Sequence, residues 1–255
     1  MSQDPFSIAG RTALITGASR GIGLAIADLF VERGAEVILV ARKQATLDEA
    51  AAALRAKGGR VHAIASHMGK MEDIERLVAT LDERGLAIDI LVNNAGISPA
   101  HGAPLADTTE ALWDKIMDVN LKGPFFLTAA IGKKMVARGR GGIINISTTS
   151  ALMAQPEIGA YCISKAALNL MTRAYAREFG PHGVRVNAIS CGLIKTSMGD
   201  FSLNDPERLA DAMKVCPLKR PGLPEEVARA VLYFASEGSS YSTGTIFQVD
   251  GGVLS

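Results

Sequence analysis

Short runs of hydrophobic residues alternate with longer amphipathic segments along most of the chain. Runs that are apolar on both faces are typical of parallel strands covered by helices on both sides. Seven such strands are predicted: Thr12–Thr16, Val37–Ala41, Val61–Ala65, Ile88–Val92, Ile143–Ser147, Val184–Ile189 and Thr245–Val249. Strand–helix alternation repeated this often predicts the α/β class: a single Rossmann-type, doubly wound parallel sheet of about seven strands flanked by helices.

The amphipathic segments between the runs predict helices that end at glycines. Ile22–Arg33 is followed by Gly34, Thr46–Lys57 by two glycines, and Glu72–Glu83 stops shortly before Gly85. Glycine is a common residue at helix C-termini. No linker or low-complexity segment divides the 255 residues, so we predict one dinucleotide-binding domain over residues 1–255.

The least regular segment covers residues 195–222, which are rich in Met, Phe and Leu and contain three prolines. It interrupts the alternation after the sixth predicted strand. Ligands of open α/β sheets bind beyond the carboxyl ends of the strands. We therefore predict a substrate lid here, with a surface excursion as the alternative.

Composition narrows the function classes. With 27 basic and 26 acidic residues the net charge is +1, which argues against a nucleic-acid groove or an anionic membrane surface as partner. Three cysteines without a CxxC pair favour a reducing compartment. The four histidines lack metal-ligand spacing, so no metal is expected. Without a secretory signal or an apolar run of ~18 residues, we expect a cytoplasmic protein that acts on a small molecule.

A glycine-rich turn follows the first predicted strand and opens a helix. Gly17, Gly21 and Gly23 allow the backbone to turn and to approach a pyrophosphate, while Ser19 and Ile22 belong to the same turn. The N–H groups and partial positive charge of the helix N-terminus would bind the phosphates. The alternative is a tight strand–helix turn without a ligand.

The end of the second predicted strand bears on the choice between NAD and NADP. An enzyme that uses NAD is expected to have Asp or Glu there to bind the ribose hydroxyls. This chain has Ala41 and Arg42, and Arg20 lies within the glycine turn. Guanidinium groups bind a 2′-phosphate that a carboxylate would repel. We therefore predict NADP(H) as cofactor, although either arginine taken alone fits a solvated surface position.

Tyr161 and Lys165 are four residues apart in a helical stretch and share one face. A phenol has a pKa near 10 and is a poor acid or base at neutral pH. An ammonium at ~4 Å would favour the phenolate by up to about 4 kcal/mol at an effective dielectric constant of 20. The pair therefore predicts a tuned tyrosine that serves as general acid or base.

Five motifs occur together and in order: TGASRGIG, NNAG, the DVNL segment with Asn120, YCISK and VDGG. With these motifs the chain resembles the classical short-chain dehydrogenase/reductase family over nearly its whole length. The resemblance implies that Tyr161 protonates a carbonyl oxygen as hydride arrives. It also implies that Lys165 lowers the Tyr161 pKa and binds the nicotinamide ribose, and that Asn120 holds a water of a proton relay.

The resemblance assigns further cofactor contacts. They comprise the cofactor wall Asn94, Ala95 and Gly96, and Thr196 with the Ile194 backbone at the nicotinamide carboxamide. It also implies a homodimer or homotetramer formed through the helices that carry Asn120 and Tyr161.

Three positions depart from the family pattern. Thr148 stands where the family has the serine that polarises the carbonyl, and Ser147 is its neighbour. Because adjacent residues of a strand face opposite sides, only one of the two can face the pocket, and we select Thr148. His67, followed by Met68, replaces an aspartate at the adenine; it is a cofactor contact or a solvated loop residue. Cys191 replaces a proline after the sixth strand and is expected to be a small packing residue.

The leading hypothesis is an NADPH-dependent carbonyl reductase, or the reverse dehydrogenase, similar to the carbonyl/retinal-reductase branch. Apolar candidates for the pocket are Ala151, Leu152, Met153, Ile158, Ile97, Pro99, Met198 and Phe201. A 3-oxoacyl-thioester reductase is the second candidate; Arg138 and Arg140 would supply part of the basic patch that it needs near the mouth, but a solvated helix end is the favoured interpretation of the two residues. A dinucleotide-binding regulatory protein without turnover is the candidate from another class.

Overall fold

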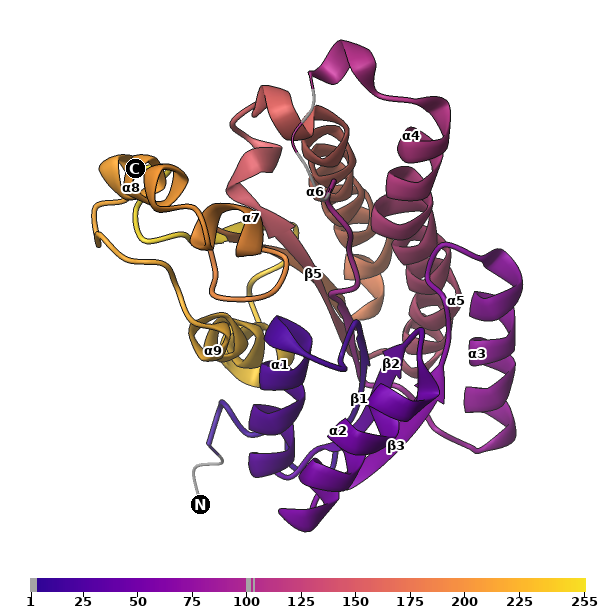
Figure 1. Ribbon diagram of the computed structural model, residues 1–255. Coiled ribbons are helices and arrows are strands. Elements are labelled where there is room, and N and C mark those ends of the chain that lie inside the picture. The colour runs from indigo at the N-terminus through magenta and orange to yellow at the C-terminus, as the bar shows by residue number, and fades with distance from the viewer. Residues whose placement is uncertain (1–3, 100–101, 103) are drawn as a thin grey trace.

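A twisted sheet of seven parallel strands forms the centre of the molecule (Figure 1). The structure is a computed structural model and describes residues 4–99, 102 and 104–255. The strand order is β3-β2-β1-β4-β5-β6-β7, so the direction of winding reverses between β1 and β4. The strands are β1 (Thr12–Thr16), β2 (Glu36–Ala41), β3 (Arg60–Ala65), β4 (Ile90–Asn93), β5 (Gly141–Thr148), β6 (Val184–Cys191) and β7 (Ile246–Val249). The predicted fold class and all seven strands are confirmed.

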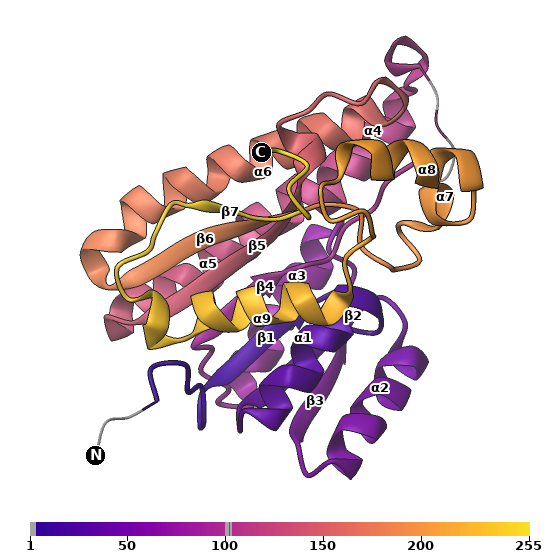
Figure 2. The same cartoon turned by 90° about the vertical axis from the view of Figure 1, so that its left-hand side faces the viewer.

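Helices cover both faces of the sheet (Figure 2). One layer consists of α1 (Gly21–Glu32), α2 (Gln44–Ala56) and α9 (Pro224–Ala235). The other consists of α3 (Met71–Glu83), α4 (Glu110–Met117), α5 (Gly123–Arg138) and α6 (Gly159–Phe179). Each layer has its own apolar core against the sheet, as strands that are hydrophobic on both faces require.

A π-helical turn, Asp118–Lys122, joins α4 to α5, and Asn120 lies inside it. Turns of this type interrupt the regular hydrogen bonding of an α-helix and are frequent at functional sites. The chain also has short 3₁₀ turns at Leu105–Asp107, Thr149–Ala151, Pro156–Ile158, Gly180–His182 and Glu237–Ser239.

The segment between β6 and α9 folds into two short helices, α7 (Asp200–Leu203) and α8 (Pro206–Val215). A parallel bridge between Ile194 and Gly222 closes its base, with hydrogen bonds from Lys195 N to Gly222 O and from Gly222 N to Leu193 O, both 2.9 Å. In both views α7 and α8 lie beyond the carboxyl ends of the strands (Figures 1 and 2). Within the described part of the chain, no helix is long and apolar enough to cross a membrane.

Candidate active site

The glycine-rich turn lies between β1 and α1 and is held by the segment after β4. Gly17 and Gly21 have positive φ values of +67° and +58°, which side chains disfavour. The side-chain amide of Asn94 donates to Thr16 O at 2.8 Å and to Gly17 O at 3.1 Å. A Cβ atom at Gly23 would lie 2.5 Å from that amide nitrogen, so only glycine fits. Asn94 therefore fixes the shape of the turn.

Thr16, at the end of β1, also binds the segment after β4. The sequence analysis did not identify this role. Its hydroxyl accepts hydrogen bonds from the backbone N–H groups of Asn94 and Ala95, both at 3.0 Å, and donates to Val92 O at 3.3 Å. The threonine was visible in the TGASRGIG motif, but only the pairing of β1 with β4 shows what it binds.

The N-terminus of α1 is free to bind an anion. Its N-cap residue Arg20 has an extended backbone and makes no side-chain capping bond, and the first turn has no acidic residue. The turn also holds Ser19 and Ile22, both partly exposed. Arg20 and Arg42 are exposed, and among the residues that the structure describes neither forms an ion pair. An uncapped helix start beside two available guanidinium groups fits a dinucleotide that carries an additional phosphate.

The segment after β3 carries His67 and Met68. His67 Nδ1 accepts a hydrogen bond from Gly69 N at 3.0 Å. The backbone N–H of His67 donates to Asp73 Oδ2 at 3.1 Å. Met68 is 4% exposed and packs in the core beside α3 and α5. The His67 ring is thus part of a local turn, and of Met68 only the backbone is placed to contact a ligand.

Asn120 is fully buried and joins three segments. Its Oδ1 accepts from Ile97 N at 2.8 Å, while Nδ2 donates to Ile97 O at 2.8 Å and to Ser164 Oγ at 3.0 Å. Ser164 Oγ in turn donates to Tyr161 O at 2.7 Å. Both hydrogens of the side-chain amide are therefore used within the protein, which connects the π-helical turn to α6. The sequence did not single out Ser164, although it lies within YCISK.

Tyr161 and Lys165 lie on the buried side of α6. Lys165 Nζ donates to Ile146 O at 2.8 Å and lies 6.0 Å from the centre of the Tyr161 ring. A Cβ atom at Gly96 would lie 3.4 Å from Lys165 Nζ and 3.5 Å from Asn120 Oδ1. The structure therefore brings Gly96, Asn120, Tyr161 and Lys165 together at the carboxyl ends of β4 and β5.

The pKa values of the pair differ from the expectation. Burial raises the pKa of Tyr161 well above 10, and the Thr148 hydroxyl is the group that lowers it in part. Burial also lowers the pKa of Lys165 to about 8. The predicted lowering of the Tyr161 pKa by Lys165 is not seen in this arrangement, because the ammonium points to the backbone of β5 and desolvation dominates.

Thr148 ends β5 and is the hydroxyl that faces Tyr161. Its Oγ1 accepts from Ser150 N at 3.3 Å and is close enough to the phenol to lower the Tyr161 pKa. Ser147 is 3% exposed, and its Oγ has no hydrogen-bond partner within the described residues. Of the two neighbours, Thr148 is thus the residue that points toward the candidate site, as the alternation along a strand requires.

The loop after β6, where the segment 195–222 begins, borders the candidate site beside α1. Ile194 is 6% exposed and belongs to the core, so that only its backbone is available to a ligand. The Thr196 methyl group lies next to Gly21, where an added Cβ atom would be 3.3 Å away. The loop after β6 therefore lies against the glycine turn. Apolar side chains are also exposed on the segments that follow β5 and β6: Leu152, Met153 and Met198 are 58%, 42% and 48% exposed.

Arg138 and Arg140 do not lie near this mouth. Both face Asp89 Oδ1, at 3.9 and 3.6 Å, and Arg138 also donates to Ile88 O. These partners precede β4, so the two arginines mark the amino-terminal end of the sheet, opposite the candidate site. They therefore do not supply basic charge at the mouth, and the interpretation as a helix end agrees with the structure, because α5 runs antiparallel to the strands and ends far from the candidate site.

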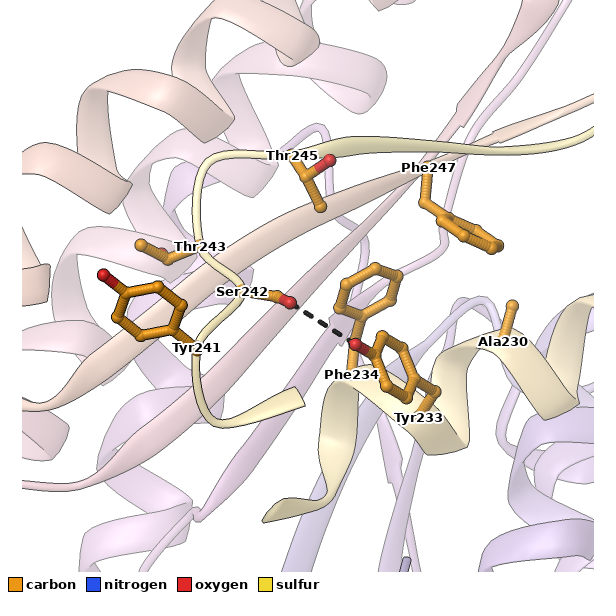
Figure 3. A pocket seen from close by; sticks show the side chains of 8 residues that line it. All are labelled: Ala230, Tyr233, Phe234, Tyr241, Ser242, Thr243, Thr245 and Phe247. Carbon is orange, nitrogen blue, oxygen red and sulfur yellow. Dashed lines mark hydrogen bonds between the residues drawn. The ribbon is translucent and has the colours of Figure 1, made fainter. Parts of the chain in front are cut away.

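A cavity of about 510 Å³ lies at the edge of the sheet, away from these residues. Figure 3 shows its lining, which comes from α9, the following loop and the start of β7. Tyr233 and Ser242 approach each other across it at 3.4 Å. Ser242 and Thr243 bind the middle of β6 through Asn187 and Val186, so this cavity is not part of the site at the carboxyl ends of the strands.

Comparison with known proteins assigns the chain to a family. The family model described as enoyl-(acyl carrier protein) reductase matches residues 17–254. The chain belongs to the short-chain dehydrogenase/reductase family. This membership confirms the resemblance derived from the five motifs.

Individual relatives cover nearly the whole chain. Dehydrogenase/reductase SDR family member 4 of Bos taurus is 42% identical over 245 residues, which are 96% of this chain and 88% of the relative. An NAD-dependent glycerol dehydrogenase of Listeria innocua is 39% identical, with 97% of this chain and 95% of the relative covered. A gluconate 5-dehydrogenase of Burkholderia cenocepacia, solved with NADP and tartrate, superposes with a TM-score of 0.94 at 32% identity and 98% coverage of both chains.

Proposed function

We propose that the protein is an NADP(H)-dependent oxidoreductase that interconverts a carbonyl compound and a secondary alcohol. The observation that carries the proposal is the buried cluster of Asn120, Tyr161 and Lys165 at the carboxyl ends of β4 and β5, next to the glycine turn. Family membership supports hydride transfer as the reaction class.

The cofactor preference rests on the two arginines. Relatives in the family differ here, since the Listeria protein is NAD-dependent and the Burkholderia structure contains NADP. In this chain Arg20 occupies the N-cap position of α1 without capping it, and Arg42 directly follows β2 with no carboxylate at its end. Both would bind the 2′-phosphate, while the uncapped start of α1, with Ser19 and Ile22, would bind the pyrophosphate.

The bound cofactor supplies or accepts the hydride. Tyr161 is kept protonated by burial, which suits the donation of a proton to a carbonyl oxygen. Thr148 polarises the same oxygen through its hydroxyl, and Lys165 binds the nicotinamide ribose. Asn120 acts as a positioning residue, because its side chain fixes Ile97 and Ser164 on either side of the site.

The remaining cofactor contacts follow from position. Asn94, Ala95 and Gly96 form the wall beside the glycine turn, and the Ile194 backbone with Thr196 would bind the carboxamide. His67 and the Met68 backbone would lie at the adenine. The segment 195–222 would cover the substrate as a lid.

An apolar carbonyl compound is the proposed substrate class. The apolar side chains of Leu152, Met153 and Met198, on the segments after β5 and β6, are exposed and available to such a substrate. The 3-oxoacyl-thioester alternative loses its specific support, since Arg138 and Arg140 lie at the other end of the sheet. A dinucleotide-binding regulatory protein without turnover is the alternative, and a wild-type protein that binds NADP⁺ but turns over no carbonyl compound would favour it.

We further propose a homodimer or homotetramer that uses the outer face of α5 and α6. Phe125 and Phe126 on α5 are each 43% exposed, and Leu170 on α6 is 68% exposed. An exposed strip of large apolar side chains next to the catalytic helix is suited to contact a second copy of the chain.

Paired calorimetric titration with NADP⁺ and NAD⁺, followed by an NADPH-consumption assay on apolar ketones, tests the function. We expect NADP⁺ to bind at least about tenfold more tightly, from one charge-assisted contact. Tyr161→Phe should reduce turnover about 10²–10⁴-fold while NADP⁺ affinity changes little. Tyr175→Phe is the matched control, because this phenol lies on the same helix and donates only to Phe125 O. Turnover that survives Tyr161→Phe would refute the acid/base role.

A further inference from the structure

The last matched positions of the β5–β6 ladder are Thr148 and Cys191. Residues that are paired in register on neighbouring parallel strands project to the same face of the sheet. Thr148 is 9% exposed and Cys191 is 5% exposed. The two side chains therefore lie next to each other in a nearly dry environment at the edge of the candidate active site.

The candidate catalytic cluster lies beside them, at the carboxyl ends of the strands. The Cys191 thiol is close enough to Tyr161 and to Lys165 to interact with the charge of either group. Burial raises the pKa of Cys191 to about 12, so its sulfur stays a neutral thiol. Among the described residues, the only hydrogen-bond acceptor for this thiol is Ile189 O, at the long distance of 4.0 Å. A thiol with these properties acts as a small apolar group rather than as a nucleophile.

Thr148 needs a neighbour of this kind. A β-branched side chain has few rotamers, and the useful one directs Oγ1 toward Tyr161 and Ser150 N. In that rotamer the γ-methyl group must occupy another direction around Cβ. The paired residue Cys191 is the adjacent side chain on the same face.

We propose that Cys191 is a positioning residue: its thiol packs against the γ-methyl group of Thr148 and holds the Thr148 hydroxyl toward Tyr161. The two residues form one unit that determines the geometry at the carbonyl oxygen. This inference rests on the proposed function only where turnover is concerned, since the packing between the two side chains is independent of it.

A double-mutant cycle with Cys191→Ala, Thr148→Ser and both together tests the pair. Denaturant unfolding is measured first, without any ligand. We expect Cys191→Ala to destabilise the wild-type chain more than it destabilises the Thr148→Ser chain, because serine has no γ-methyl group to lose a partner. Cys216→Ala is the matched control: this thiol is 3% exposed at the base of the lid, and its cost should be the same in both backgrounds.

Activity gives the second readout. Cys191→Ala should lower kcat about tenfold with little change in KM, because Thr148 acts on the carbonyl oxygen and on Tyr161 rather than on substrate binding. Cys191→Val, which keeps an apolar group at the γ position, should restore most of the loss. If the thiol only supported the fold, the kcat of the folded protein would not change.

The outcomes separate the two hypotheses. Equal unfolding costs of Cys191→Ala in both backgrounds would overturn the packing between the two residues. Coupled unfolding costs with an unchanged kcat would overturn the effect of the pair on the active site. A wild-type protein that binds NADP⁺ and turns over no carbonyl compound would instead refute the proposed function, and the unfolding cycle would still decide whether the residues act as a unit.

Discussion

At the scale of single residues, burial has opposite effects on the two central ionisable groups. The same loss of water raises the pKa of the Tyr161 phenol and lowers the pKa of the Lys165 ammonium to about 8, because both changes favour the uncharged form. At neutral pH the site therefore holds a protonated tyrosine beside a lysine that is closer to losing its proton than a surface lysine is. A protonated phenol is able to donate a proton to a carbonyl oxygen, which is the proton transfer that carbonyl reduction requires.

Lys165 should leave a signature in the pH dependence of stability. Its folded pKa of about 8 lies below the unfolded value of 10.5, so between these pH values the unfolded chain binds more protons at this position. The contribution of Lys165 to stability therefore rises with pH in this window. Urea unfolding should show Lys165→Met at its largest advantage over the wild type at pH 7.5, and that advantage should shrink by on the order of 2 kcal/mol at pH 9.5. Parallel profiles of the two proteins would contradict the shifted pKa.

Arg42 should discriminate between the two dinucleotides. Its guanidinium is exposed directly after β2 and is available for a phosphate. Arg42→Ala should weaken NADP⁺ binding about 10- to 100-fold, as expected for one charge-assisted contact, and should leave NAD⁺ binding nearly unchanged. Arg33→Ala, an exposed arginine at the other end of α1, is the control in the same titrations. Equal weakening of both dinucleotides by Arg42→Ala would refute the role in 2′-phosphate binding.

At the scale of elements, the connections between strands and helices shape the site. The π-helical turn buries Asn120 where its amide reaches both Ile97 and Ser164. On the opposite side of the mouth, α8 of the lid segment is tied to the turn before α6. Arg208 donates to Glu157 Oε2 at 2.8 Å, and its guanidinium lies 4.1 Å from the centre of the Phe201 ring. This ion pair is the contact through which α8 reaches the segment that leads to Tyr161.

Breaking this ion pair should affect substrate binding more than stability. Both side chains are partly exposed, at 39% and 54%, and exposed ion pairs contribute at most about 1 kcal/mol. Arg208→Ala should therefore change the melting temperature only slightly but raise KM several-fold, because the lid loses its tie to the mouth. Lys214→Ala, which removes the Asp211 pair on the same helix, is the control. An unchanged KM in steady-state assays would mean that the ion pair does not hold the lid.

At the scale of the whole molecule, the two helical layers differ in what they present to solvent. The layer of α1, α2 and α9 packs against one face of the sheet, over strands β1 to β6. The layer with α5 and α6 covers the other face and leaves Phe125, Phe126 and Leu170 exposed. Since α6 also carries Tyr161 and Lys165, a second copy on this face would hold the catalytic helix from outside.

Sedimentation velocity of Leu170→Glu tests this arrangement. Leu170 is 68% exposed, so a glutamate fits the single chain at little cost, whereas a charge placed against a second copy is unfavourable. We expect the variant to sediment as a smaller species than the wild type at equal concentration. Lys195→Glu, an exposed change in the lid segment, controls for the effect of charge alone. Identical sedimentation of wild type and Leu170→Glu would place any interface elsewhere.

Hydrophobic periodicity and motif order are local properties of the chain, and they were sufficient to predict the class of fold, the seven strands and the family. Alternation along a strand is a local rule as well, and it predicted that Thr148 rather than Ser147 faces Tyr161; the catalytic role of Thr148 stays a prediction. The glycine-rich turn that opens a helix could also be recognised from neighbouring residues.

The contact partners of these residues become visible only in the folded chain. The binding of the glycine turn by Asn94 and Thr16 depends on the pairing of β1 with β4. The position of Arg138 depends on the direction of α5 relative to the sheet, and the pKa values of Tyr161 and Lys165 depend on burial. Each of these is set by contacts between segments far apart in the chain, and a pattern of neighbouring residues does not contain them.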